Sequence, residues 1–369
     1  MRFPVKLSFY IARSFFQTFV MVFLMVAAVI ILGDVVDMIR RSYSAELPFS
    51  VIMRMVLYKF PIEIQKLFGF VILIAAMLSL VKLTRTNELI IARSSGISVW
   101  QFLRPVVVTS FLIGIFVITV YNPLACALMT KYDKLLTKHV HGRTNLMEVS
   151  PTGIWLRQHN YPLVKDKPGE TIIHALRAAK ENLELYEVVF FVFAQEDKFS
   201  YRIDARTALL ENGYWHMHDA ILTFPDKPGE LHPDYLLATD LTRAEIQDSF
   251  ASPESISFWA LPGFISALKN AGFSAIKHRM YWFQMLVIPF LLSAMVFIAA
   301  SFSLRQPRQG RIPLLISISV CVGFSIYFFS DLISALAMAG NIPIPLAAFA
   351  PTGVCLLLGV SFLMHTEDG

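Results

Sequence analysis

Residues 14–33 read SFFQTFVMVFLMVAAVIILG, and this run contains no charged side chain between Arg13 and Asp34. An α-helix needs about 20 consecutive apolar residues to cross the hydrocarbon core of a bilayer, and the run has that length. Its apolar core is longer than the roughly 7–15 residues of a secretory signal peptide, and no clear small-x-small cleavage site follows it. We therefore expect residues 14–33 to form a retained first transmembrane helix.

Further apolar runs indicate an α-helical membrane protein with six transmembrane helices. In the 369-residue chain 56% of residues are hydrophobic and 16% are charged, whereas soluble domains have about 25% charged residues. Because the run 67–81 is short, we expect residues 58–66 to extend its helix, with Lys59 and Lys66 reaching the interface. The runs after the first are 67–81, 105–130, 280–304 and the two parts of 312–366 that GNIPIP at 340–345 separates.

Basic residues lie on one side of this topology. The net charge of +5 is spread over residues that flank the apolar runs, which argues against a nucleic-acid-binding patch and reports membrane orientation instead. With six spans, the N-terminus and the connections 82–104 and 305–311 lie on the same side, and all three are rich in Lys and Arg. We therefore expect that side, and both termini, to be cytoplasmic, with the stretch 131–256 on the opposite side.

The stretch 131–256 has the composition of an all-β domain. Short β-rich runs such as YRIDA at 201–205 alternate with turn sequences such as KDKPGE at 165–170. Strands at short intervals with Pro, Gly and Asp between them predict a β-sandwich or a jelly roll. VVFFVFA at 188–194 is apolar throughout, so we expect it to be a central strand.

Two H-x-H pairs are the only hint of metal chemistry in this stretch. His139 with His141, and His216 with His218, would each place two imidazoles on one face of a strand, where zinc can bind. We favour solvent-facing or cross-strand histidines, because no carboxylate or cysteine lies at an obvious ligand spacing. No G-x-S-x-G or other nucleophile motif is present, so we expect no catalytic residues. The three cysteines (Cys126, Cys321 and Cys355) form neither a disulfide framework nor a C-x-x-C pair.

Residues 257–274, SFWALPGFISALKNAGFS, return to helical spacing. Leu261, Ile265 and Leu268 form an apolar stripe, and Gly272 is placed to end the helix. We expect a helix at the membrane surface that leads into the fourth span, and a simple connector is an equally good interpretation.

A second short helix is expected near 84–97, between the second and third spans. Thr84 or Thr86 can cap its N-terminus, and Glu88 then lies in the first turn, where the helix dipole favours an acidic side chain. An apolar patch and a terminating glycine follow: Leu89, Ile90, Ala92 and Gly96. Such a helix either docks a separate ATPase or only holds two spans together. The chain has no G-x-x-x-x-G-K-[ST] phosphate loop, so ATP hydrolysis would require a partner chain.

The stretch NELIIARSSGIS at 87–98 resembles the [S/N]-E-L-x-x-x-x-x-x-G motif of the lipopolysaccharide export permeases, the LptF/LptG family. The order of parts is also similar: three spans, a β domain, then three spans. Further resemblance lies in SFWALPGFISALKNAG at 257–272, RMYWFQMLVIPF at 279–290 and FSIYFFSDLISALAMAGNIPIPLAAFAPT at 324–352. The resemblance covers nearly the whole chain, and the short tail after the sixth span is more like the G member.

The resemblance implies a non-catalytic permease subunit of an ABC transporter in the Gram-negative inner membrane. Such a transporter extracts lipopolysaccharide from the inner membrane and passes it to a periplasmic bridge for transport to the outer membrane. Its implied partners are an LptF-like second permease, an LptB-like ATPase dimer that uses ATP and Mg, a single-span LptC-like protein and an LptA-like bridge. No cofactor would be bound by this chain. The implied domains are 1–130 with transmembrane helices 1–3, a periplasmic β-jellyroll at 131–256 with an edge strand open to strand addition, and 257–369 with the connector helix and helices 4–6.

The resemblance also assigns site residues. ATPase coupling would fall to Asn87, Glu88, Arg93 and Gly96; lipid phosphate binding to Lys131, Lys134, Arg40 and Arg41; and the cavity and a gate between spans one and five to Phe324, Tyr327, Phe328 and Asp331. One departure is Asp34, with Asp37 nearby, where G-type members have a lysine near the periplasmic end of span one. Three explanations stay open: a less anionic lipid, a cation from the partner permease, or a role for Lys131 and Lys134.

Two other classes of protein compete with this interpretation. An ion-driven secondary lipid transporter would show internal repeats and broken helices with charges at the membrane midplane, and no convincing repeat is present. A membrane-anchored scaffold or enzyme would carry its activity in the β domain, where no motif supports it.

Overall fold

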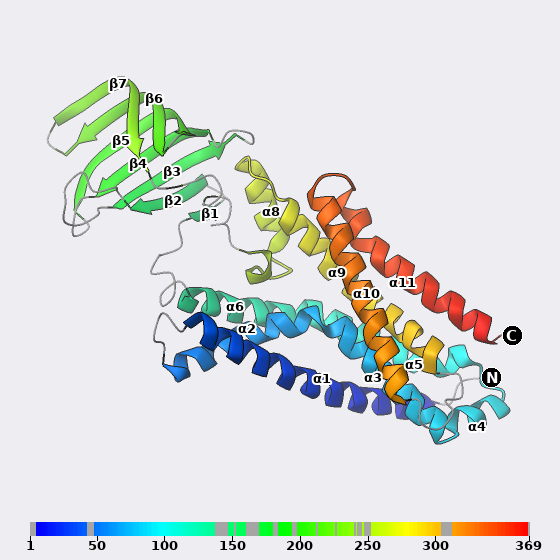
Figure 1. Ribbon diagram of the computed structural model, residues 1–369. Coiled ribbons are helices and arrows are strands. Elements are labelled where there is room, and N and C mark those ends of the chain that lie inside the picture. The colour runs from blue at the N-terminus through cyan, green and yellow to red at the C-terminus, as the bar shows by residue number, and fades with distance from the viewer. Residues whose placement is uncertain are drawn as a thin grey trace. The chain divides into compact units, whose positions relative to one another are not determined.

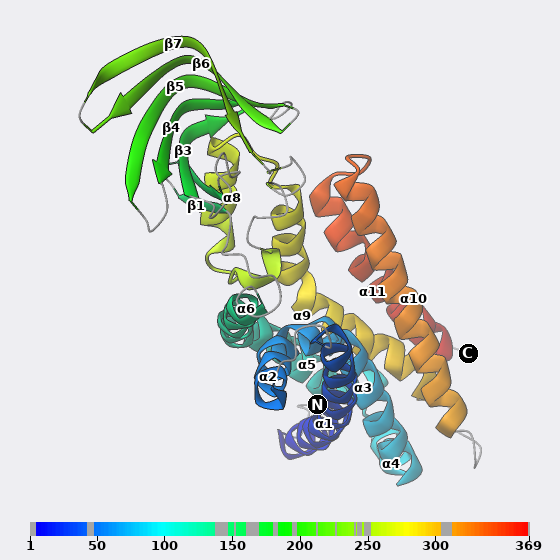
Figure 2. The ribbon, with the colours of Figure 1, turned by 60° about the vertical axis from the view of Figure 1, so that its left-hand side comes forward.

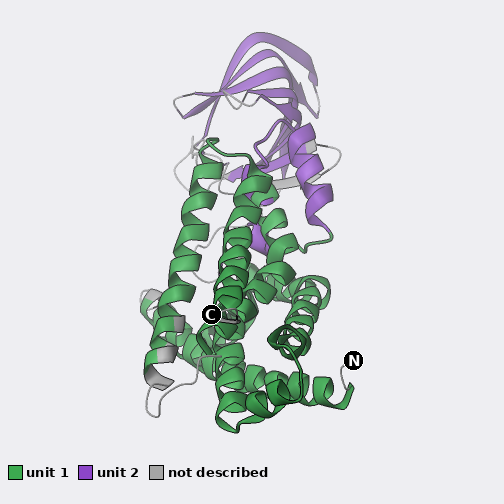
Figure 3. Ribbon diagram, turned by 90° about the vertical axis from the view of Figure 1, so that its right-hand side faces the viewer, with its two compact units in different colours: residues 1–135, 257–259, 279–369 green, residues 136–256, 260–278 purple. Residues whose placement is uncertain are grey.

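The computed structural model separates the chain into two compact units (Figure 3). Unit 1 contains residues 1–135, 257–259 and 279–369, and unit 2 contains residues 136–256 and 260–278. The structure describes residues 5–42, 48–136, 147–150, 153–159, 170–179, 184–193, 198–211, 213–225, 227–239, 241, 246, 252–303 and 312–367.

Six helical segments among the described residues are long and apolar enough to cross a membrane, which confirms the predicted number of spans. A π-helical segment, Val117–Tyr121, joins α5 to α6, so that Val99–Leu136 is one of the six. The chain is therefore a multi-pass membrane protein with an inserted all-β part. The helices before and after this insert are α1 (Val5–Ser42), α2 (Phe49–Lys66), α3 (Phe68–Arg85), α4 (Glu88–Ser94), α5 (Val99–Phe116), α6 (Asn122–Leu136), α9 (Ile276–Ser303), α10 (Ile312–Met338) and α11 (Ile344–Glu367) (Figure 1).

The region before the second span forms a helix of its own, so the expected extension of that span by residues 58–66 is wrong. Leu67 leaves the helical conformation, with φ −98° and ψ 3°, and separates α2 from α3. Lys59 of α2 lies 3.0 Å from Asp34 of α1 and 3.3 Å from Glu63. Lys59 therefore pairs with carboxylates of both α1 and α2, which suits a helix packed beside α1.

The core of unit 1 is built around α3. Ile72 and Leu80 of α3 are fully buried, and the same apolar cluster contains Phe15 of α1, Phe102 of α5 and Ala299 of α9. This core thus unites helices from before the β insert with helices from after it. The outward faces of α1 and α10 carry many exposed apolar side chains, as expected of helices that border lipid or another membrane subunit.

Glycines allow three close approaches between the helices of unit 1. A Cβ added at Gly114 of α5 would lie 2.5 Å from the Cα of Pro289 in α9. A Cβ at Gly359 of α11 would lie 2.8 Å from the Cβ of Phe297, and one at Gly323 of α10 would lie 2.7 Å from the ring of Phe70. Small residues at such crossings let membrane helices pack by van der Waals contact, since lipid supplies no hydrophobic drive for association.

The β insert forms a single seven-stranded antiparallel sheet among the described residues, with the strands in chain order. The all-β prediction is confirmed, but these strands do not form the two sheets of a sandwich, because each strand pairs with its successor in one continuous sheet. The sheet is strongly curved (Figure 2), so the jelly-roll-like shape comes from one bent sheet. The strands are β1 (Met147–Ser150), β2 (Gly153–His159), β3 (Glu170–Ala178), β4 (Leu185–Phe193), β5 (Phe199–Glu211), β6 (Tyr214–Phe224) and β7 (Lys227–Ala238).

One face of the sheet is buried and the other is exposed. Along β6, Trp215 and Met217 are fully buried while the residues between and beside them are accessible, as the two-residue period of a strand requires. β4, which contains most of the apolar run 188–194, lies in the middle of the sheet between β3 and β5, so the central-strand prediction is confirmed. The buried carboxamide Oε1 of Gln158 accepts hydrogen bonds from Trp215 Nε1 (2.9 Å) and Thr239 Oγ1 (2.7 Å).

Helix α8 (Leu261–Asn270) belongs to unit 2. Its buried residues are the predicted stripe Leu261, Ile265 and Leu268. Gly272, with φ +85°, ends it as predicted: the N–H of Phe273 donates to the carbonyl of Leu268 at 2.9 Å, which is the Schellman pattern. The end of the helix meets β3, where the N–H of Ala178 donates to the carbonyl of Ala271 at 2.9 Å.

Candidate functional site

Helix α4 follows α3 through a two-residue turn rather than a side-chain cap. The predicted caps Thr84 and Thr86 are wrong, because Thr84 lies inside α3 and Thr86 is the residue that follows that helix. Asn87 precedes α4 in the left-handed conformation, with φ +61°, and makes no side-chain capping bond. Asparagine tolerates this conformation better than most residues, which gives the asparagine of the motif a structural role.

Glu88, the first residue of α4, accepts hydrogen bonds from two hydroxyl groups. The Thr86 hydroxyl donates to Oε1 at 2.7 Å, and the Tyr10 hydroxyl of α1 donates to the same oxygen at 3.2 Å. These bonds fix the start of α4 against the turn and against α1. Both hydroxyl groups bond to Oε1, so neither of them occupies the second carboxylate oxygen, Oε2.

The two faces of α4 differ in exposure. Leu89 and Ala92 are buried in the core of unit 1, whereas Ile90 and Ile91 are 43% and 62% exposed. The predicted apolar patch is therefore divided, since Ile90 points away from Leu89 and Ala92. Arg93 is exposed as well. The exposed face of α4 is thus apolar and basic, while its opposite face packs in the core of unit 1.

Gly96 ends α4, as predicted. Its φ is +82°, its N–H donates to the carbonyl of Arg93 at 2.9 Å, and the N–H of Ile97 donates to the carbonyl of Ala92 at 3.1 Å. Directly afterwards Ser98 and Gln101 form a capping box that starts α5. Both ends of α4 are therefore set by local hydrogen bonds, and the four residues assigned to coupling lie on one seven-residue helix and its two flanking turns.

The cations assigned to phosphate binding lie on two helices. Lys131 and Lys134 are exposed on α6, and the ammonium of Lys131 lies 5.9 Å from the centre of the Tyr58 ring on α2. Arg40 is exposed near the end of α1, and the side chain of Arg41 lies outside the described residues.

The negative charge of Asp34 is balanced by a cation. The ammonium of Lys59 on α2 lies 3.0 Å from Oδ1 of Asp34. Sequence reasoning missed Lys59 as its partner. An antiparallel pairing of α1 with α2 would have been the signal, because it brings together residues that are far apart in the chain.

An apolar cavity of about 680 Å³ lies between α9, α10 and α11. Phe324 and Phe328, two of the predicted cavity residues, line it, whereas Tyr327 and Asp331 are not among its lining residues. Successive residues of a helix point in different directions, and the assignment of all four residues to a lipid cavity or gate stays a prediction. The walls that the sequence did not single out come from α9 and α11, and include Ile298, Phe302, Leu358 and Phe362.

A comparison of the chain with protein families decides its relationship. The family model described as lipopolysaccharide export system permease LptF/LptG matches residues 9–365, which is nearly the whole chain. The chain belongs to the LptF/LptG family. The resemblance read from NELIIARSSGIS is thereby confirmed.

A curated relative supports the G-type character of this permease. The present chain is 22% identical over 327 residues to the lipopolysaccharide export system permease protein LptG of Haemophilus influenzae. The match covers 84% of each chain. Membership of a permease family indicates a transport subunit rather than an enzyme. The family is one of inner-membrane proteins, which agrees with the six apolar helices of this permease.

The H-x-H pairs of this permease have different outcomes. His139 and His141 lie outside the described residues. His216 and His218 lie on the accessible face of β6, and the sheet brings Asp234 of β7 beside them. The sequence prediction found no carboxylate at ligand spacing because it considered local spacing only. The pairing of β6 with β7 would have revealed Asp234, which is cross-strand to His218.

Proposed function

We propose that this permease is the G-type membrane subunit of an ABC exporter, which extracts lipopolysaccharide from the inner membrane and passes it to a periplasmic bridge. ATP and Mg would be used by a separate LptB-like ATPase dimer, and an LptF-like permease, an LptC-like protein and an LptA-like bridge would complete the assembly. Unit 2 would lie in the periplasm and both termini in the cytoplasm. Family membership supports the permease role, and the geometry of α4 carries the link to an ATPase.

Helix α4 is built as a coupling element. Leu89 and Ala92 are buried in an apolar cluster that also contains side chains of α1, α3 and α9. A force applied to the exposed face of α4 would therefore be transmitted to these transmembrane helices. The hydrogen bond from Tyr10 to Glu88 adds a direct link to α1. Oε2 of Glu88 would contact the ATPase together with Ile90, Ile91 and Arg93, and Asn87 and Gly96 would set the two turns that aim these side chains.

The apolar cavity supports a lipid substrate. Its walls are almost entirely apolar and aromatic side chains of α9, α10 and α11, which suit acyl chains rather than a polar solute. The anionic headgroup would be met by Lys131, Lys134, Arg40 and Arg41, since cations with several N–H donors bind phosphate well. The pairing of Asp34 with Lys59 leaves these four residues as the proposed source of positive charge on this chain.

The coupling role predicts that Glu88→Lys releases the ATPase. A hydrogen bond to a charged group contributes about 1.5–3 kcal/mol, so replacing the carboxylate by a cation should lower the ATPase recovered with the purified permease about tenfold or more. The measurement is quantitative mass spectrometry of the complex purified in mild detergent from the native host. Recovery of the second permease should be unchanged, because α4 is the only element altered.

Two control variants separate charge from helix structure. Glu88→Gln keeps an oxygen that can accept from Thr86 and Tyr10 but removes the charge, and it should also lose ATPase. Thr86→Val removes one internal hydrogen bond but keeps the carboxylate, and it should retain most of the ATPase. Normal ATPase recovery with Glu88→Lys would contradict the coupling role of this residue.

The cavity predicts site-specific contact with lipopolysaccharide. A photo-crosslinking amino acid at Phe328 should form adducts with lipopolysaccharide in cells, because Phe328 lines the cavity. The same amino acid at Tyr327, the preceding residue, is the matched control, since Tyr327 is exposed but is not a lining residue. Equal adduct yields at both positions, measured by immunoblot with an antibody against lipopolysaccharide, would show that the cavity does not select this lipid.

A further inference from the structure

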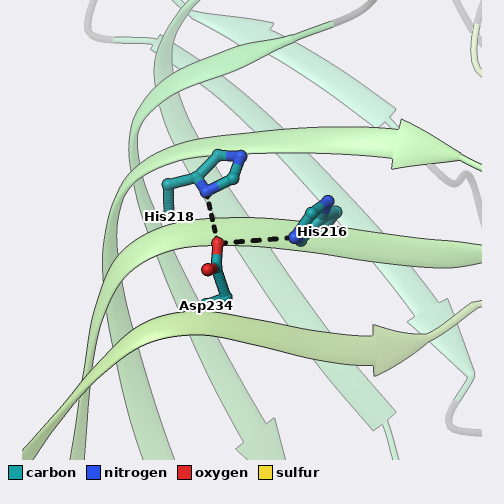
Figure 4. A group of neighbouring side chains, drawn as sticks. All are labelled: His216, His218 and Asp234. Atoms are coloured by element: carbon teal, nitrogen blue, oxygen red, sulfur yellow. Dashed lines mark hydrogen bonds and ion pairs between the residues drawn. The ribbon is translucent and has the colours of Figure 1, made fainter.

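His216, His218 and Asp234 form a compact group on the accessible face of unit 2 (Figure 4). Asp234 Oδ1 lies 2.6 Å from Nδ1 of His218 and 3.5 Å from Nε2 of His216. One ligand atom from each of the three residues lies within 4.8 Å of those from the other two. No step of the proposed lipid transport uses these residues.

The sheet places the three side chains together. His216 and His218 are two residues apart on β6, so both point to the same face, and their ring centres are 4.6 Å apart. Asp234 of β7 pairs directly with His218 and lies diagonally across from His216. Trp215 and Met217, which alternate with the histidines, are fully buried. Their packing holds the β6 backbone and therefore fixes the direction of both imidazoles.

Two imidazoles and one carboxylate are a common ligand set for zinc and similar divalent ions. Zinc bonds of about 2.0–2.1 Å in a tetrahedral site put neighbouring ligand atoms roughly 3.3 Å apart. The separation of 3.5 Å between His216 Nε2 and Asp234 Oδ1 is close to this value. The 2.6 Å contact between His218 and Asp234 is a hydrogen bond, and its proton would be displaced when the metal binds, because a ligating imidazole nitrogen must be deprotonated.

We propose that His216 Nε2, His218 Nδ1 and Asp234 Oδ1 bind one divalent transition-metal ion of the zinc type. Opening the His218–Asp234 contact by several tenths of an ångström is within reach of these side chains, which are 33%, 49% and 64% exposed for His216, His218 and Asp234. The site has three protein ligands and leaves a fourth position for water or for a ligand from another molecule. β7 is the last strand of the described sheet, so the fourth position lies near an edge that another chain can approach.

The competing explanation is a hydrogen-bonded cross-strand pair with no ion. Neighbouring charged side chains pair with one another and fit both explanations. Nε2 of His232 lies 3.8 Å from Oε2 of Glu230, and Nη1 of Arg206 lies 3.9 Å from Oδ2 of Asp219. The two explanations differ in whether the chain binds a stoichiometric metal ion through these three residues.

The test is metal binding by the full-length chain in detergent, purified through a tag without histidine and treated with a chelator. A titration with Zn²⁺, measured by isothermal calorimetry, should show about one equivalent bound per chain. Co²⁺ in place of Zn²⁺ should give the visible absorption of a tetrahedral site. His216→Ala, His218→Ala and Asp234→Asn should each weaken binding at least tenfold, because each removes one of three ligands. Asp234→Asn is nearly isosteric, so it tests the charge with little change in packing.

His174→Ala is the matched control. His174 lies on β3 of the same sheet and packs on the ring of Trp155, with 4.3 Å between ring centres, so its loss should leave metal affinity unchanged. Circular dichroism shows whether each variant keeps its folded β content. Absence of a stoichiometric metal ion in the normal chain, or unchanged affinity in the two histidine variants or in Asp234→Asn, would overturn the proposal. None of these measurements depends on transport, so they succeed or fail independently of the exporter role.

Discussion

Among Gly→Ala substitutions at the described glycines of unit 2, Gly272→Ala is expected to be the most destabilising. Gly272 has φ +85°, and a Cβ built on it would lie 1.7 Å from the carbonyl oxygen of Ala178. A positive φ disfavours alanine by roughly 1–2 kcal/mol. The contact is far shorter than any van der Waals distance and involves backbone, so α8 must move away from the end of β3.

That movement disturbs two hydrogen bonds, one between the sheet and the helix and one at the end of the helix itself. The N–H of Ala178 would lose the carbonyl of Ala271, and the Schellman bond between Phe273 and Leu268 would be strained. Together we expect a loss of roughly 3 kcal/mol or more, which lowers the unfolding midpoint of a unit of this size by roughly 10 °C. Calorimetry of the full chain in detergent gives the midpoint. Hydrogen exchange of peptides from β3 and α8 shows whether the damage lies at their junction.

Two other glycines of unit 2 separate the causes. Gly213 also has a positive φ, +81°, but its added Cβ would meet its nearest atom, the carbonyl oxygen of Thr239, at an ordinary 3.6 Å. Gly213→Ala should therefore show only the backbone term. A Cβ at Gly263, inside α8, meets nothing within 4 Å, so Gly263→Ala should be neutral or stabilise by up to about 1 kcal/mol. Equal effects at Gly272 and Gly213 would mean that the contact with Ala178 does not limit stability.

Gly114→Ala is expected to produce the largest change in unit 1. The added Cβ would lie 2.5 Å from the Cα of Pro289 and 3.0 Å from its nitrogen. Both are backbone atoms, so no side chain can turn aside and α5 must separate from α9. Overpacking of this kind destabilises by about 1–3 kcal/mol, and at a helix crossing it also disturbs the core that surrounds α3.

The measurement is the thermal midpoint of the chain in detergent, followed by the fraction that elutes as a single species in size exclusion. Gly353→Ala is the matched control, because Gly353 is also inside a membrane helix and its Cβ would meet nothing within 4 Å. Gly359→Ala should fall between the two, since its nearest contact is the Cβ of Phe297 at 2.8 Å. If Gly114→Ala melts with the normal chain, α5 and α9 do not pack closely at Pro289.

The number of spans was predictable because lipid imposes a rule that is local in sequence. A helix that crosses the bilayer needs a charge-free run of a certain length, and each run can be counted without knowing its neighbours. The glycine stops at Gly96 and Gly272 were predictable for a similar reason, since a left-handed terminus is set by the residue itself. The all-β insert followed from its alternation and turns.

The pairings that build sites were not predictable, because they depend on elements far apart in the chain. Asp34 meets Lys59 only through the packing of α1 with α2. Asp234 meets His218 only through the register of β6 with β7. The N-terminus of α4 was missed for another reason: Thr84 and Thr86 have the composition of caps, but α3 continues through Thr84 and the turn is made by Asn87. The cavity walls on α9 and α11 are ordinary apolar residues, which sequence cannot distinguish from other lipid-facing ones.

The core that unites helices from both ends of the chain has a consequence for biosynthesis. Ala299 of α9 packs in one cluster with Phe15 and Phe102, yet the ribosome must make the residues between Leu135 and Arg279, about 140 of them, before α9 exists. At about 5–20 residues per second this interval lasts roughly 7 to 30 seconds. During it the first three spans wait in the membrane with one side of their core open, while the sheet, whose strands pair in chain order, can form as it emerges. Lipid chains can cover that apolar surface in the meantime, because they are as apolar as the side chains of α9 that later replace them.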